Sequence, residues 1–172
     1  MCIRDSQATP NEGLNSDVGL TDLPLGEQFV LWAARIWVKS NHGAPTLHLN
    51  LRNGFRVAEV EDGYLMLDRI MTLLSTRASM EFRFHCTCCK GITDHEHAVL
   101  GVIAEFQTGD EANAHIILSE WLPSSAAYAT GREFQDFAML LKENGLHIRE
   151  RQWFPIGGKH PSMPASPCLL YT

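Results

Sequence analysis

The stretch VEDGYLMLDRIMTLL, residues 60–74, decides the fold class of this chain. Its apolar side chains recur at alternating steps of four and three residues, which is the period of one face of an α-helix. A helix with such a stripe gains its stability by burying that face against other elements. The stretch therefore predicts an amphipathic helix over about residues 60–77, with an inner face formed by Val60, Tyr64, Leu67, Met71 and Leu74.

The same period predicts further helices on both sides of this one. An apolar stripe runs from Leu25 to Trp37 and ends at Asn41-His42-Gly43. Residues 45–57 fit either an alternating strand or a helix, and we favour a helix because both neighbours are helical. After residue 90, a helix begins at the capping box of Thr93 and Glu96, and another spans residues 112–121.

A last helix is expected to begin at a second capping box, Thr130 with Glu133, and to end at Gly145. Two segments change period: residues 80–86 and 146–153 alternate in polarity, which indicates short extended segments. Together these predicted helices and segments indicate a mainly all-α protein, a single-domain bundle of five or six helices.

The two ends of the chain do not resemble natural protein sequence. Residues 1–6, MCIRDS, and residues 168–172, CLLYT, match what the two strands of a transposon-derived sequencing adapter encode, so we expect them to be adapter-derived. Between them we expect a flexible lead-in over residues 7–21, one helical domain over residues 22–153 and a tail over residues 154–167.

The composition excludes several classes of function. The 172 residues are 45% hydrophobic and 20% charged, as in globular proteins. A net charge of −6 provides no general attraction to phosphate backbones, so we expect no nucleic-acid partner. No apolar run reaches the roughly 18–20 residues that span a bilayer, so we expect no membrane insertion. The interior cysteines lie too close together for a disulfide framework, which favours a reducing cytoplasm.

Those cysteines form the candidate site, in the sequence HCTCC at residues 85–89. Cys86 and Cys89 make a C-x-x-C pair, the spacing at which a tight turn brings two thiolates onto one zinc ion. His95 and His97, at the start of the next predicted helix, supply the other two ligands in this hypothesis, with Cys88 as a substitute ligand. A closed four-ligand site would be structural, because it leaves no position for water.

Two other interpretations of the same residues stay open. Cysteines are small apolar side chains in a buried turn when they are neither reactive nor bound to metal. A dithiol close to a helix start also exchanges disulfides if its thiol pKa is low. Thioredoxin-like chemistry, however, requires a βαβ unit, and the flanking patterns here are helical.

Part of the sequence resembles a known group of proteins. The segment LPLGEQ, residues 23–28, followed by LWAARIW, residues 31–37, is similar to the opening of small, uncharacterised proteobacterial helical proteins of unknown function. In those proteins a cysteine pair follows the third helix and a Trp-Leu-Pro turn comes later, as at residues 121–123 here. The resemblance spans about residues 23–146 and implies a bacterial helical fold without a settled activity. It does not extend to Cys88 or to the two histidines.

The sequence contains no nucleophile elbow, phosphate-binding loop or dinucleotide fingerprint, which favours a protein that is not an enzyme. We therefore expect a cytoplasmic accessory or regulatory binding protein whose partner is another protein, with a structural zinc ion at the Cys86–Cys89 turn. One alternative is a small thiol-redox protein or enzyme that uses the same cysteines. Another is a metal-free interaction module with an exposed apolar face around Trp32 or Trp37.

Overall fold

The computed structural model describes residues 19–41, 43 and 46–150. Over these residues the chain forms six α-helices and one turn of 3-10 helix, and it contains no β-strand. The predicted all-α class is confirmed. The two ends predicted to be adapter-derived, the predicted tail and most of the predicted lead-in lie outside the described residues. The described part of the lead-in, residues 19–21, leads into the 3-10 turn Leu20–Asp22.

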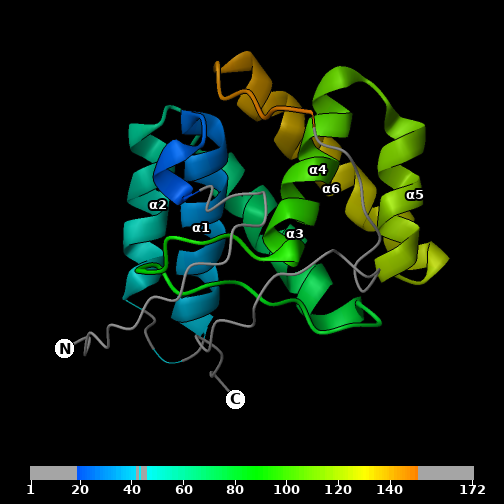
Figure 1. The fold of residues 1–172 in the computed structure, drawn as a ribbon, viewed down its shortest axis with the longest axis horizontal. Helices are drawn as coiled ribbons and strands as arrows, with labels where there is room; N and C mark the ends of the chain where they lie inside the picture. Colours follow the sequence, from blue (N-terminus) through cyan, green and yellow to red (C-terminus); the bar gives the residue numbers. More distant parts are fainter. Residues whose placement is uncertain (1–18, 42, 44–45, 151–172) are drawn as a thin grey trace, which may run out of the picture.

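The helices divide into two groups that share one core (Figure 1). α1 and α2 pack against each other on one side of the molecule, and α6 packs against α3, α4 and α5 on the other. α3 also contacts α1 and α2, so it joins the two groups. The helices are α1 (Leu25–Asn41), α2 (Leu47–Val57), α3 (Gly63–Arg77), α4 (Asp94–Thr108), α5 (Glu111–Trp121) and α6 (Ser124–Glu143).

α2 is the stretch whose sequence fits both a strand and a helix. In the structure it is a helix, as favoured, and it buries Leu51 and Phe55 while Leu49 is exposed. Phe55 lies edge-on to Phe29 of α1, with ring centroids 5.0 Å apart, and its ring centroid is 6.3 Å from that of Phe137 in α6. Edge-to-face packing is a preferred aromatic geometry. The contacts of the Phe55 ring with Phe29 and Phe137 therefore favour the helix over the strand in this stretch.

Of the two tryptophans of α1, Trp37 belongs to the core and Trp32 packs against the core. Trp37 is buried, and its indole nitrogen donates a hydrogen bond to Asp68 of α3 at 2.7 Å. Trp32 is half-buried, and its ring covers Gly54, where an added Cβ would collide with it. The expectation of an exposed apolar face around Trp37 is therefore wrong.

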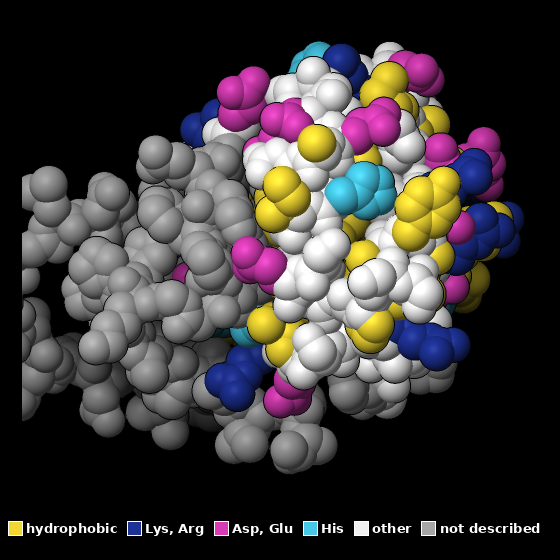
Figure 2. Space-filling model, turned by 90° about the vertical axis from the view of Figure 1, so that its right-hand side faces the viewer, with side chains coloured by type: hydrophobic (Ala, Val, Ile, Leu, Met, Phe, Trp, Pro, Cys, Tyr) yellow, Lys and Arg dark blue, Asp and Glu magenta, His cyan; other side chains and the backbone are white. Residues whose placement is uncertain are grey.

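Large apolar side chains are exposed elsewhere, on several helices. Figure 2 shows the face that carries α5, where apolar side chains lie apart from one another among charged and polar ones. Scattered single apolar residues are normal on protein surfaces. The most exposed large apolar residues are Leu25, Leu49, Val57, Leu65, Ile116 and Tyr128.

The start of α6 differs from the prediction. The helix begins at Ser124, directly after Pro123, and Thr130 is buried inside it rather than capping it. Proline suits a helix start, because the amide that it lacks would have no partner there. The carbonyl of Pro123 accepts the amides of Ala126 and Ala127 at 2.9 Å. At the other end, Gly145 has a φ of +76°, as expected of a glycine that ends a helix.

The predicted extended segments are non-helical where the structure describes them, and neither forms a strand there. Residues 146–150 run back along the start of α1, so closely that a Cβ on Gly26 would lie 2.7 Å from the carbonyl oxygen of His147. Glu27, the next residue of α1, is fully buried. Its carboxylate accepts hydrogen bonds from the amide and the guanidinium of Arg149 at 3.0 to 3.2 Å. Residues 151–153 lie outside the described residues.

Within the described residues, no helix combines the length and the apolar character needed to cross a membrane.

Candidate metal centre

The cysteines lie on the connection between α3 and α4, residues 78–93. Loops without secondary structure rarely exceed about 12–15 residues in compact domains, and this connection is longer than that. The connection is nevertheless tied down by hydrogen bonds. The amide of Ser79 donates to the carbonyl of Trp121 at 2.8 Å, and the hydroxyl of Thr93 donates to the carbonyl of Arg83 at 2.7 Å. The connection is therefore a fixed part of the domain.

Its strongest anchor is an ion pair inside the protein. Arg35 of α1 and Glu96 of α4 have fully buried side chains, and Nε of the arginine lies 2.6 Å from Oε1 of the glutamate. A second bond, from Nη2 to Oε2 at 3.0 Å, makes the pair bidentate. The same guanidinium donates to the carbonyl of Cys89 at 2.8 Å and to that of Gly91 at 2.7 Å. Arg35 thus holds the backbone of the cysteine turn against α1.

Glu96 holds the same turn from the side of α4. Its carboxylate accepts the amide of His85 at 3.2 Å and that of Thr93 at 2.8 Å. The Thr93 hydroxyl in turn accepts the amide of Glu96 at 3.0 Å, so the predicted capping box is confirmed. One carboxylate therefore caps a helix, neutralises Arg35 and fixes the residue before the first cysteine.

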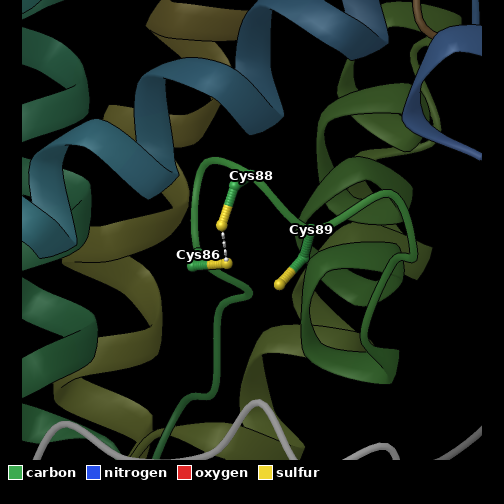
Figure 3. Close-up of side chains that lie close together, drawn as sticks. All are labelled: Cys86, Cys88 and Cys89. Carbon is green, nitrogen blue, oxygen red and sulfur yellow. Dashed lines mark hydrogen bonds between the residues drawn. The ribbon is translucent and has the colours of Figure 1, made fainter. Parts of the chain in front are cut away.

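Within this frame the three thiols converge (Figure 3). The amide of Cys89 donates to the carbonyl of Cys86 at 3.1 Å, which closes the turn. The three sulfurs all lie within 4.8 Å of one another, and the sulfurs of Cys86 and Cys88 are 2.8 Å apart. Cys86 and Cys89 are half-buried and Cys88 is exposed. A group of this kind is able to hold a thiophilic metal ion.

The thiols perturb one another's ionisation. Burial raises the pKa of Cys86, but hydrogen bonds from the thiols and amides of Cys88 and Cys89 outweigh it and lower that pKa from 9.0 to about 7. The pKa of Cys88 is raised, because its thiol donates to Cys86 and because the negative charge of Cys86 opposes a second one nearby. At neutral pH the group therefore contains thiolate, the form that binds metals and attacks electrophiles.

The two histidines predicted as ligands are not part of this group. Among the described residues, the cluster of possible metal ligands consists of Cys86, Cys88 and Cys89. The ring of His95 is half-buried against Phe82, with centroids 5.3 Å apart, and this burial lowers its pKa. His97 is exposed on α4. The structure thus brings together the C-x-x-C pair and the substitute ligand Cys88.

The residues that support the site were only partly visible in the sequence. Glu96 is recognisable as a capping-box residue, but nothing local to it indicates that it pairs with a residue of the first helix. The one signal for Arg35 is its position inside the apolar run of residues 29–38. A charge on the buried face of a helix requires a buried partner, and that rule could have found the pair.

Comparisons of the chain with protein-family models, with curated proteins and with solved structures find no match. The resemblance to small proteobacterial helical proteins stays a prediction.

Replacing Arg35 by methionine leaves the Glu96 carboxylate buried opposite an apolar side chain. Removing one partner of a buried ion pair typically costs about 3–5 kcal/mol. We expect a loss of that size in the free energy of unfolding, measured by urea denaturation of the reduced protein with circular dichroism as the signal.

The matched control is Arg52→Met, which removes an ion pair at 3.8 Å whose two side chains are mostly exposed. Such pairs contribute about 0–1 kcal/mol. Equal, small losses in the two variants would show that the Arg35–Glu96 pair does not anchor the fold.

The pKa of Cys86 also predicts how the thiols react. Because the thiolate is the reactive form, alkylation of Cys86 by iodoacetamide should become faster as the pH rises. Its rate should reach half of the maximum near pH 7. Alkylation of Cys88 should reach half of its maximal rate at a higher pH. In Cys88→Ala the midpoint for Cys86 should move upward, because a hydrogen bond to its thiolate is lost. Mass spectrometry of the metal-free protein measures both rates, and a midpoint near 9.0 in the unmodified protein would contradict this assignment.

Proposed function

We propose that this chain is a bacterial accessory or regulatory binding protein that works in the cytoplasm, with a metal ion, zinc, held at its cysteine turn and another protein as its partner. The observation that carries the metal is the convergence of three sulfurs within 4.8 Å on one turn. Thiolates at about 2.3 Å are common zinc ligands in structural sites. The reducing cytoplasm keeps such thiols available.

In this proposal the metal is structural and adds to the anchoring of the connection. Arg35 holds the carbonyls of Cys89 and Gly91, so the backbone of the turn is fixed before any ion binds. A metal bound by the thiols of Cys86 and Cys89 would fix their side chains as well. Binding to the folded state alone stabilises it, by about 2.7 kcal/mol when the free ion is at 100 times its Kd. The acidic net charge of −6 supports a protein partner over a nucleic acid.

A thiol-redox protein is the second candidate, supported by the 2.8 Å contact between the sulfurs of Cys86 and Cys88. In such a reaction, one thiolate attacks a small-molecule disulfide and releases one of its halves as a thiolate. A neighbouring thiolate then displaces the other half and closes a disulfide within the turn. Two cysteine thiols are oxidised and one external disulfide is reduced to two thiols.

Elemental analysis of the full chain, purified without an affinity-tag metal, distinguishes the two candidate functions. We expect about one zinc per chain, because the sulfurs are already gathered. The Cys86→Ser/Cys89→Ser double variant should lose the metal and unfold at a lower urea concentration. Cys2→Ser/Cys168→Ser, which removes the two remaining cysteines of the chain, is the matched control and should keep the metal.

Absence of metal from a folded, reduced protein would reject the metal centre. Reversible loss of two hydrogens per chain on treatment with a small disulfide, detected by mass spectrometry, would then establish the redox candidate. If neither metal nor reversible oxidation is found, a metal-free helical interaction module is the account that remains.

A further inference from the structure

We infer that the outer face of α2 is a docking surface for an acidic segment of a partner protein, in which two carboxylates pair with Arg52 and Arg56 and an apolar side chain packs on Leu49. This inference rests on the protein partner of the proposed function and specifies the chemistry of that partner. It does not involve the cysteine turn, so the metal and the docking surface are tested separately.

The first support is a hollow in the surface of α2, which lies at the outer edge of its side of the molecule (Figure 1). The hollow has a volume of about 240 Å³ and is lined by Leu49, Arg52, Asn53, Arg56 and Glu61, all of which are exposed. Sites for small molecules usually have volumes of about 300–1,000 Å³ and enclose most of the ligand. This hollow is smaller and is open to solvent, so it suits side chains of a protein segment that lies across the helix.

The second support is unbalanced positive charge. The sequence of α2 contains two arginines and no aspartate or glutamate. Among the described residues, none forms a hydrogen bond or an ion pair with the guanidinium of Arg56. Arg52 approaches Glu61 at 3.8 Å, and both side chains are mostly exposed, so this pair is weak. Both guanidinium groups are therefore available to carboxylates of a partner, which arginine binds in a bidentate geometry.

The third support is the spacing of these side chains. With a rise of about 1.5 Å per residue, Arg52 and Arg56 lie about 4.5 and 10.5 Å beyond Leu49 along the helix axis, and at about 100° per residue the three point within about 60° of one another. In an extended segment, every second side chain points the same way, at intervals of about 6.6–6.8 Å. An apolar residue followed by glutamates two and four positions later therefore matches the three side chains, within the reach of the long arginines.

Leu49 gains its meaning from this neighbourhood. Its side chain is 67% exposed, and a single exposed leucine is ordinary on a protein surface. Here it lines the same hollow as two arginines, and this combination fits a segment that is acidic and apolar at once.

The surroundings favour a short acidic segment over a nucleic acid or a membrane. Anionic lipids are typically bound by clusters of about 4–8 Lys and Arg side chains, and phosphate backbones also require several cations. α2 provides two, and it is followed by Glu59, Glu61 and Asp62, all exposed. These carboxylates repel a long polyanion, whereas a segment with two carboxylates needs contact only with the arginines.

The probe is the synthetic peptide GSLSESESG, capped at both ends, which has the required spacing of leucine and two glutamates. It is titrated into the reduced, nitrogen-15-labelled full chain, and amide chemical shifts are followed by NMR. We expect the largest shift changes in residues 47–57. The peptide GSLSQSQSG should bind about fivefold more weakly, because two exposed ion pairs are lost. Salt at about 1 M should weaken the binding of the acidic peptide alone, since it screens exposed charges.

The variant Arg52→Gln/Arg56→Gln should bind the acidic peptide about fivefold more weakly and the glutamine peptide as the unmodified protein does. The matched control Arg77→Gln/Arg132→Gln removes two exposed arginines that do not line the hollow, and it should keep the full affinity. Circular dichroism verifies that each variant is folded, as we expect for substitutions of exposed side chains.

Several results would overturn the inference. They are the absence of shift changes at millimolar peptide, equal affinity for the two peptides, and full affinity in Arg52→Gln/Arg56→Gln. Shift changes confined to another surface would also overturn it, while the protein partner of the proposed function would stand. If a twelve-nucleotide single-stranded DNA or vesicles of phosphatidylserine bind more tightly than the peptide and through the same arginines, the inference and the protein partner both fail. The zinc content of the same sample reports on the metal independently.

Discussion

The buried ion pair between Arg35 and Glu96 is the interaction on which the rest of this structure depends. An unpaired charge inside a protein is so costly that it is not retained. Arg35 therefore needs its carboxylate, and the two carbonyls of the cysteine turn take up further donors of the same guanidinium. Because the two residues lie on α1 and α4, the pair joins the first helix to the fourth. Both residues also hydrogen-bond to the backbone of the connection between α3 and α4. The cysteines are thus placed by electrostatics and hydrogen bonds, since the connection has no secondary structure of its own.

α1 carries a second buried charge, of opposite sign, within its first turn. Glu27 accepts the amide and the guanidinium of Arg149, and this contact raises the pKa of that arginine. The first helix therefore holds two non-helical segments: Glu27 holds the one after α6, and Arg35 holds the one before α4. Buried polar groups that are fully paired specify a single arrangement more sharply than apolar contacts do. In this protein they fix the segments that helix packing alone leaves undefined.

The sequence predicts the helices of this protein better than it predicts the site. The stripe of residues 60–74 and the capping box of Thr93 are local signals, and the structure contains both helices, although α3 begins at Gly63 rather than at the predicted residue 60. The start of α6 was misplaced because Thr130 and Glu133 have the spacing of a capping box, whereas Pro123 provides the earlier start. Which side chains gather at the cysteine turn depends on where the side chains of α4 point, and Glu96 points at a residue sixty-one positions away in the chain. Spacing within residues 86–97 contains no information on that partner, so the sequence does not predict that the three thiols gather without His95 and His97.

The central claim is that Arg35 and Glu96 make the cysteine turn part of the core even without a metal. Amide hydrogen exchange of the reduced, metal-free protein tests it most directly, because the amides of His85 and Thr93 both donate to the Glu96 carboxylate. If the claim holds, these two amides exchange only through global unfolding, with protection within about tenfold of that in the centre of α4. Exchange of both amides at the rate of an unstructured peptide, while α4 stays protected, would show that the turn opens independently and would contradict the claim.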